Sequence, residues 1–144
     1  YFKNSKFCDQ LILIINLVDD KFDSSFEKFL IDFSSSRTIF KKLNEVNFVK
    51  FKNKYKNKKI LYLKCRKESF LHTVYNMNPW EDLLIGFQCK VKRFPNSYNI
   101  NFWNHFTNIY IKSKNIRKVN DCNGCEKINH YFDNEIHKEN TKIA

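Results

Sequence analysis

The first strongly apolar stretch of the chain covers residues 5–18, with the sequence SKFCDQLILIINLV. Its density of apolar side chains predicts a helix that is amphipathic at its start and buried further on, with Ser5 as the N-cap. Aspartates at positions 19–23 should end this helix. The next apolar run, residues 26–33, is rich in aromatic side chains and is followed by three serines, which predicts a strand.

A second helix is predicted over roughly residues 37–49, capped by Ser35 or Ser36. Its apolar side chains recur at helical spacing and would form one face. They are Ile39, Phe40, Leu43 and Val46. A run of lysines follows, and residues 60–65 (ILYLKC) then predict a strand that leads away from it.

Residues 66–83 are expected to form a long loop, since they contain two asparagines, a proline and a tryptophan flanked by acids. Residues 84–93 predict a half-buried strand, because Phe87, Cys89 and Val91 alternate with polar side chains. Residues 98–111 carry apolar and aromatic side chains at helical spacing and predict a third helix that packs on the sheet.

The predicted order of elements is therefore helix, strand, helix, strand, long loop, strand and helix. This order favours an α+β fold in which helices cover one face of an antiparallel sheet and the other face displays Lys and Arg. Residues 1–118 are expected to form this domain. Residues 119–144 would be a C-terminal extension of uncertain fold, with a possible last strand at 128–136.

The composition narrows the class of protein. Two glycines and two prolines in 144 residues exclude a Gly-rich phosphate loop and a collagen-like chain, and 42% hydrophobic residues exclude a disordered polar tail. The longest apolar run is too short to span a bilayer, and no signal peptide is visible. Asn, Lys, Ile, Phe and Tyr make up more than half of the chain, which indicates an AT-rich genome, organellar or protist.

The formal net charge of +11 is concentrated in one segment. Residues 41–67 hold eleven basic residues and one acidic residue, whereas residues 1–40 and 68–144 are close to neutral. Such a concentration of positive charge favours a segment that contacts phosphates of a polyanion. The alternatives are a solvated loop and a membrane-surface segment, although the latter would need an apolar helical face that the stretch lacks.

The five cysteines form no regular framework, so a reducing compartment is expected rather than a disulfide scaffold. Cys8 and Cys89 lie in apolar segments and are expected to be small core residues. A weak zinc-binding pattern consists of Cys122, Cys125, His130 and His137. The alternative is that the two cysteines are reduced and lie in a surface turn.

No catalytic constellation is evident. His72 and His105 lack a nearby nucleophile, and adjacent Glu81 and Asp82 are better explained as cap or turn residues than as paired catalytic carboxylates. We therefore expect neither an enzyme nor a cofactor.

Five segments carry a family resemblance through their sequences and their order along the chain. They are residues 10–16 (QLILIIN), 24–32 (SSFEKFLID), 63–69 (LKCRKES), 85–93 (IGFQCKVKR) and 102–109 (FWNHFTNI). Together they resemble the universal large-subunit ribosomal protein five family, whose members hold 5S rRNA in the central protuberance. The first two resemble the opening helix and strand of that family, the third its T-K-A-K-K-S segment, the fourth its I-G-x-K-V-T-L-R strand, and the last its F-L-D-R-L-I helix.

The resemblance covers about residues 5–118. The chain departs from the family in three places: the lysine run replaces the T-G-Q-K-P turn, the loop before residue 85 is slightly longer, and the C-terminal strands are shortened or unrecognisable. Such divergence fits a mitochondrial, organelle-encoded version of the family. Some mitochondrial ribosomes lack 5S rRNA altogether.

The resemblance implies a ferredoxin-like α+β domain in the mitochondrial large subunit. Expected partners are rRNA (5S or large-subunit rRNA), neighbouring ribosomal proteins including a small-subunit head protein, and P-site tRNA, with no membrane. The expected rRNA-binding residues are Lys50, Lys52, Lys54, Lys56, Lys58, Lys59, Lys64, Arg66, Lys67, Lys90, Lys92 and Arg93.

The family's loop that approaches the tRNA elbow corresponds here to about residues 70–83. The side chains expected to face tRNA are Tyr75, Asn76, Met77, Asn78 and Trp80. Aromatic residues in such a loop can stack on exposed bases. The alternative for Trp80 is packing against the sheet.

Two other functions remain open from the sequence. The chain could be a lineage-specific structural subunit of a large organellar assembly held mainly by protein contacts, in which case the lysines would face acidic protein or solvent. A zinc-dependent nucleic-acid enzyme would need a bound metal and a nearby carboxylate, for which the sequence gives no support.

Overall fold

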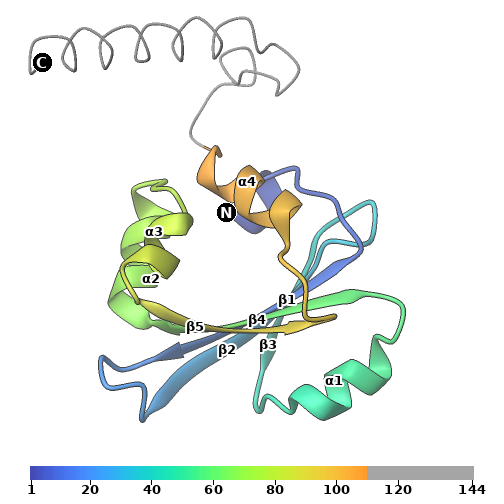
Figure 1. The fold of residues 1–144 in the computed structure, drawn as a ribbon, viewed down its shortest axis with the longest axis horizontal. Helices are drawn as coiled ribbons and strands as arrows, with labels where there is room; N and C mark the ends of the chain where they lie inside the picture. The colour runs from blue at the N-terminus through green and yellow to red at the C-terminus, as the bar shows by residue number, and fades with distance from the viewer. Residues whose placement is uncertain (110–144) are drawn as a thin grey trace, which may run out of the picture. The chain divides into compact units, whose positions relative to one another are not determined.

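The computed structural model describes residues 1–109 as a five-stranded mixed sheet with helices on both faces (Figure 1). The strands lie in the order β3-β2-β1-β4-β5, and neighbours are antiparallel except for the parallel pair β1 and β4. Their bounds are β1 Leu11–Val18, β2 Ser25–Asp32, β3 Ile39–Leu43, β4 Lys59–Arg66 and β5 Cys89–Phe94. The α+β class is confirmed, and the mixed sheet is compatible with a ferredoxin-like fold.

The first apolar stretch forms a strand, so the predicted helix over residues 5–18 is wrong. All eight residues of β1 are buried, because the strand lies at the centre of the sheet with side chains packed on both faces. A strand buried on both faces has a continuous apolar sequence and no period of two. The short helix at this end of the chain is the 3-10 turn η1, Phe2–Asn4.

The predicted helix over residues 37–49 is also wrong, because it merges two elements. Its first half is β3, which pairs with β2 and packs the Phe40 ring against that of Phe29 at a centroid distance of 5.0 Å. The helix α1 begins only at Phe48 and ends at Lys54. Asn47 is its N-cap, and the side chain of Asn47 accepts a hydrogen bond from the backbone N–H of Lys50. The expected caps Ser35 and Ser36 lie in the β2–β3 connection instead.

The predicted loop at residues 66–83 contains two helices, α2 Lys67–Tyr75 and α3 Glu81–Ile85. Phe70 and Thr73 point into the core one turn apart, which is the pattern of an amphipathic helix. The predicted strands at 26–33 and 60–65 are confirmed, as is the third helix, α4, Ile100–Thr107. The strand at 84–93 is confirmed from Cys89 onward.

The face of the sheet under α2, α3 and α4 carries an aromatic core. Trp80 is fully buried at its centre and contacts Phe70, Phe102 and Phe106 at ring-centroid distances of 5.7, 5.5 and 5.1 Å. Its indole nitrogen donates a 2.7 Å hydrogen bond to the hydroxyl of Tyr1. Burial raises the pKa of Tyr1 to about 12, although the hydrogen bond from Trp80 acts in the opposite direction.

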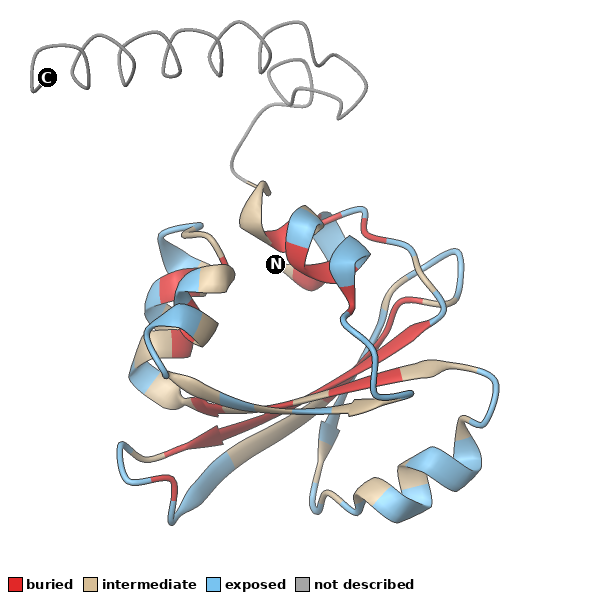
Figure 2. Ribbon diagram, viewed as in Figure 1, coloured by how far each residue is buried: buried red, intermediate tan, exposed pale blue. Residues whose placement is uncertain are grey.

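The opposite face of the sheet carries a smaller apolar cluster beneath α1. Figure 2 shows α1 on this side of the sheet, mostly exposed with half-buried positions between the exposed ones. Buried side chains of the sheet pack there against three aromatic residues of the α1 segment, Phe48, Phe51 and Tyr55. The sequence predicted helices on one face only. The structure adds α1 to the other face, because these three aromatics recur at positions i, i+3 and i+7 of one helical stripe.

Some predictions concern single residues or undescribed segments. Cys8 is exposed, contrary to expectation, whereas Cys89 is half-buried on the core face. Phe87 precedes β5 and is exposed, so the alternation does not extend to it. Among the described residues no helix is long and apolar enough to cross a membrane. The possible strand at 128–136, the C-terminal extension and the zinc pattern lie outside the described residues.

Candidate nucleic-acid interface

Helix α1 carries half of the lysine run and exposes these side chains at the surface. Phe48, Phe51 and Tyr55 hold the helix against the sheet, and the intervening residues Lys50, Lys52 and Lys54 are exposed. Lysines in the last turn of a helix also interact favourably with its partial negative charge. Lys50 and Lys54 are about one turn apart and share one side of this short helix, whereas Lys52 faces β5. The outer surface of α1 is largely exposed (Figure 2).

Two cation–π contacts join this helix to the edge strand β5. The ammonium nitrogen of Lys52 lies 4.4 Å from the centre of the Phe94 ring, and that of Lys92 lies 4.6 Å from the centre of the Phe48 ring. Each contact pairs a lysine of one element with an aromatic ring of the other. Both lysines remain exposed, so an aromatic ring positions each charge without neutralising it.

A row of polar side chains crosses four strands next to α1. Asn16 is in register with Lys28 on one side and with Lys64 on the other, and Lys64 is in register with Lys90. Tyr62, two residues before Lys64, packs in the apolar cluster beneath α1. Because side chains alternate along a strand, the polar row lies on the same face of the sheet as that cluster.

The lysines that α1, β2, β4 and β5 place on this face are called the lysine face below; Lys41 of β3, in register with Leu30, lies on the same face beyond them. The lysine face consists of Lys28, Lys50, Lys52, Lys54, Lys64, Lys90 and Lys92. Only Lys50 among them has a recorded ion pair, with Glu45 at 3.7 Å, and both partners are highly exposed. Exposed pairs of this kind contribute little, so the positive charge of the surface is largely uncompensated.

The β1–β2 turn bounds the polar row at the end away from α1. Phe22 lies in this turn in the left-handed backbone region (φ 65°) with its side chain buried. The ammonium group of Lys64 donates a hydrogen bond to its carbonyl oxygen, and Lys90 and Arg66 lie over its ring at 4.8 and 5.0 Å. The turn thus holds three basic side chains at one residue, two over its ring and one at its carbonyl oxygen.

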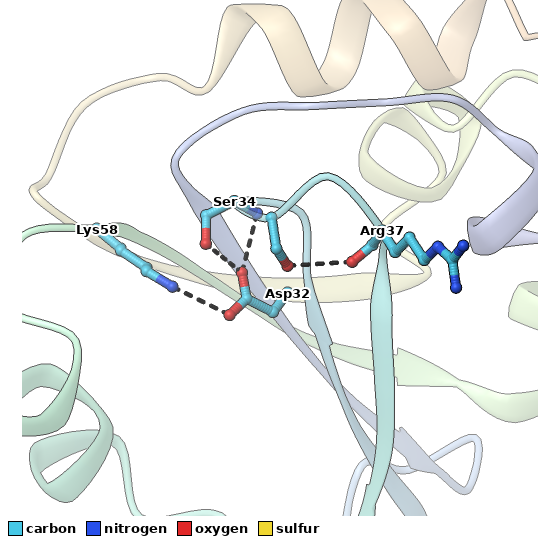
Figure 3. Close-up of polar contacts among 5 residues, drawn as sticks. Asp32, Ser34, Arg37 and Lys58 are labelled. Atoms are coloured by element: carbon cyan, nitrogen blue, oxygen red, sulfur yellow. Dashed lines mark hydrogen bonds and ion pairs between the residues drawn. The ribbon is translucent and has the colours of Figure 1, made fainter.

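Some residues expected to bind rRNA are engaged within the chain. Lys58 pairs with Asp32 at 3.0 Å (Figure 3), and Lys59 pairs with Asp9 at 3.2 Å. Arg66 donates hydrogen bonds to the Asp20 carbonyl and to the side chain of Gln88. These three cations stabilise the fold and are poorer candidates for phosphate contacts.

The Asp32 carboxylate receives several hydrogen bonds. Burial by itself would raise its pKa, but hydrogen bonds from the side chain and backbone of Ser34, together with the hydrogen bond and charge of Lys58, hold that pKa below its usual range. The Asp32–Lys58 pair therefore links the α1–β4 turn to the end of β2 (Figure 3).

The other expected rRNA-binding residues are scattered. Arg93 is in register with Leu61 on the core face, and its guanidinium lies 5.6 Å from the Tyr98 ring, so it does not belong to the lysine face. Lys67 begins α2, where it lies over the ring of Phe26. Lys56 is exposed in the turn after α1.

The segment expected to face tRNA is divided between surface and core. Tyr75, Asn76 and Met77 are exposed at the end of α2, whereas Trp80 is fully buried. The prediction that Trp80 faces tRNA is therefore wrong, and its packing against the sheet is the correct alternative. Burial of a large aromatic side chain in the core outweighs the local turn chemistry.

Sequence reasoning missed Lys28 and the ring of Phe22. Apolar and polar side chains alternate only partly over residues 27–32, so the pattern does not assign Lys28 to a particular face of the sheet. The pairing of β1 with both β2 and β4 could not be read from the local pattern. No cluster of three or more potential metal ligands occurs within residues 1–109.

Comparisons with known proteins give only short similarities. The cytidine monophosphate-N-acetylneuraminic acid hydroxylase of Sus scrofa is 43% identical over 44 residues, which are 31% of this chain and 10% of that protein. The hydroxylase of the same name from Xenopus laevis is 49% identical over 35 residues, 24% of this chain and 6% of that protein. The chain thus spans a tenth or less of the curated relatives it matches. No protein-family profile and no solved structure matches it.

Proposed function

We propose that this chain is a structural, non-enzymatic RNA-binding protein of the mitochondrial large ribosomal subunit, and that the lysine face contacts rRNA phosphates. The observation that carries the RNA-binding part is the clustering of seven lysines from one helix and three strands on a single face. The resemblance of the ordered segments to the universal large-subunit ribosomal protein five family supports the ribosomal part.

The arrangement suits a phosphate backbone better than a compact ligand. The lysine face is spread along α1 and across the sheet, so it can neutralise several phosphates along a strand, and each neutralised phosphate releases a counterion. Flexible lysine side chains act as point charges, as expected for contacts without base specificity.

The short similarity to the hydroxylases does not change this proposal, because it covers less than a third of this chain and a tenth or less of those proteins. The tRNA contact also belongs to the proposal. It rests on the exposed ring of Tyr75, which can stack on a base, and on the exposed side chain of Met77, which can pack against one, and no longer on Trp80.

RNA binding of the full chain tests the role of the lysine face. The variant K52Q/K54Q removes two cations from α1, and the matched control K21Q/K42Q removes two exposed cations elsewhere: Lys21 lies in the β1–β2 turn, and Lys42 pairs with Glu27 on the core face. We expect the first variant to lower the slope of log K against log salt by about 1 per lost contact. An equal slope in both variants would contradict the assignment.

Cosedimentation with ribosomal subunits tests whether the chain belongs to the large subunit. The proposal requires the chain to comigrate with large ribosomal subunits and to form RNA crosslinks within residues 48–56. Comigration with crosslinks to protein only would favour the alternative, a lineage-specific structural subunit held by protein contacts. A chain that does not comigrate with ribosomal particles is not a ribosomal protein.

A further inference from the structure

A second cationic site lies away from the lysine face, in a pocket of about 560 Å³. The N-terminal segment and the β2–β3 connection form its walls. Its lining residues are Lys3, Lys6, Phe7, Cys8, Ser35, Ser36, Arg37 and Thr38. The lining thus contains three cations and three hydroxyl groups but no carboxylate, although residues 1–40 as a whole have a formal charge of −1.

The positive charge of this pocket is not neutralised by the nearest segments of the described chain. Asp9 and Asp32 are the acidic residues closest in sequence to the lining residues, and both are engaged elsewhere. Asp9 pairs with Lys59, and Asp32 pairs with Lys58. None of the ion pairs found in residues 1–109 includes Lys3, Lys6 or Arg37.

The backbone holds Lys6 in an unusual conformation at this pocket. Its φ of 57° lies in the left-handed region, which is strained for a residue with a Cβ. The flanking residues fix it there: the Ser5 hydroxyl donates to the Phe2 carbonyl and accepts from the Phe7 backbone, and Phe7 is buried in the core. Such strain occurs preferentially at binding sites, and here Lys6 is exposed between two anchored residues.

The opposite wall is also ordered by hydrogen bonds. The Asp32 carboxylate accepts from the backbone and hydroxyl of Ser34, and the Ser35 hydroxyl donates to the Arg37 carbonyl at 3.0 Å. Figure 3 shows the Arg37 side chain extending away from the Asp32–Lys58 pair. Its guanidinium is therefore not part of that ion pair.

We propose that this pocket binds a phosphate group, carried either by a nucleic-acid strand or by a free phosphorylated small molecule. A guanidinium binds phosphate oxygens in a bidentate manner, two ammonium groups add charge, and the hydroxyls of Ser36 and Thr38 can donate further hydrogen bonds. This inference does not depend on the lysine face or on ribosomal assembly.

The test follows backbone amide shifts by NMR in the full-length protein during titration with AMP or with a pentauridylate that lacks terminal phosphates. We expect saturable shifts at residues 6–8 and 35–38. In K6Q/R37Q the Kd at these amides should rise about tenfold or more, since two charge-assisted contacts are lost. The matched control K21Q/K42Q should retain the wild-type Kd.

The two probes separate the possible sources of the phosphate. Tighter saturation by AMP assigns the pocket to a free phosphate monoester, and tighter saturation by the oligonucleotide assigns it to a strand. Unsaturable shifts, or the same Kd in K6Q/R37Q and wild type, would overturn the proposal. K52Q/K54Q should leave the AMP response intact, so failure of the lysine face and failure of this pocket are distinguishable.

Discussion

The two faces of the sheet are built from the same strands but differ in how much apolar surface they bury and how much positive charge they display. The face under α2, α3 and α4 buries two tryptophans and a cluster of phenylalanines, whereas the face under α1 has a cluster of only four buried apolar side chains and displays lysines. The first face supplies most of the apolar burial that stabilises the fold. The second uses a thin apolar layer to position charge. Stability and proposed binding are therefore largely separated, and substitutions can address each face alone.

The largest effect is expected from W80A on the core face. Removing a fully buried tryptophan leaves a cavity and should lower the free energy of unfolding by about 3–5 kcal/mol. Urea denaturation followed by circular dichroism measures this loss. The control Y75A truncates an exposed aromatic residue and should change stability by less than about 0.5 kcal/mol. A W80A loss as small as that of Y75A would contradict the central role of Trp80.

On the other face, F51A should cost about 2 kcal/mol, less than W80A because Phe51 is only half-buried. The loss should be concentrated in α1, so amide hydrogen exchange in residues 48–55 should accelerate more than exchange in β1. The control V49A alters an exposed residue of the same helix and should leave exchange nearly unchanged. Uniform acceleration throughout the domain would show that the two faces are not energetically separate.

The pH dependence of stability probes the link between α1 and the sheet. Because the folded pKa of Asp32 is lowered, its contribution is present at neutral pH and is lost as the pH falls below the unfolded value of about 4 toward the folded value. D32N should cost about 1–2 kcal/mol at pH 7 and reduce the loss of stability between pH 5 and pH 2. Denaturation at several pH values tests this, and parallel curves for wild type and D32N would contradict it.

The smallest effect is expected at the start of α1. N47A removes the side chain that caps the helix and should cost about 1 kcal/mol, whereas N47D should restore most of it because aspartate is an equally good cap. Hydrogen exchange at Lys50, whose amide donates to that cap, is the direct readout. The same protection in N47A as in wild type would indicate that packing alone fixes the helix.

The sequence predicted the parts of the fold where local pattern and final environment agree. Residues 26–33 and 60–65 read as strands, and the helical spacing of Trp103 and Phe106 identified α4. It failed for β1, because a strand buried on both faces and a buried helix have the same continuous apolar sequence. The sequence pattern also failed to predict α2. The asparagines and the proline that follow Tyr75 favour a turn, and they obscure the helical spacing of Phe70 and Thr73.

The sequence predicted which residue types form the candidate site but not how these residues are arranged in space. The excess of lysines around residue 50 was evident, but which of them remain unpaired depends on contacts distant in sequence, such as Lys59 with Asp9. The cross-strand row depends on register: Asn16 joins Lys28 and Lys64, which come from strands separated by β3 and α1 along the chain. Such pairings cannot be inferred from local periodicity.

The parallel pairing of β1 with β4 also has a consequence for synthesis. β1, β2 and β3 can form a meander as soon as they leave the ribosome that makes them, but the second edge of β1 stays open until residues 59–66 have emerged. An apolar strand with a free edge is a site for mispairing with other chains. About forty residues must therefore be synthesised between the end of β1 and the start of its partner β4. The nascent chain is most vulnerable to aggregation during that interval.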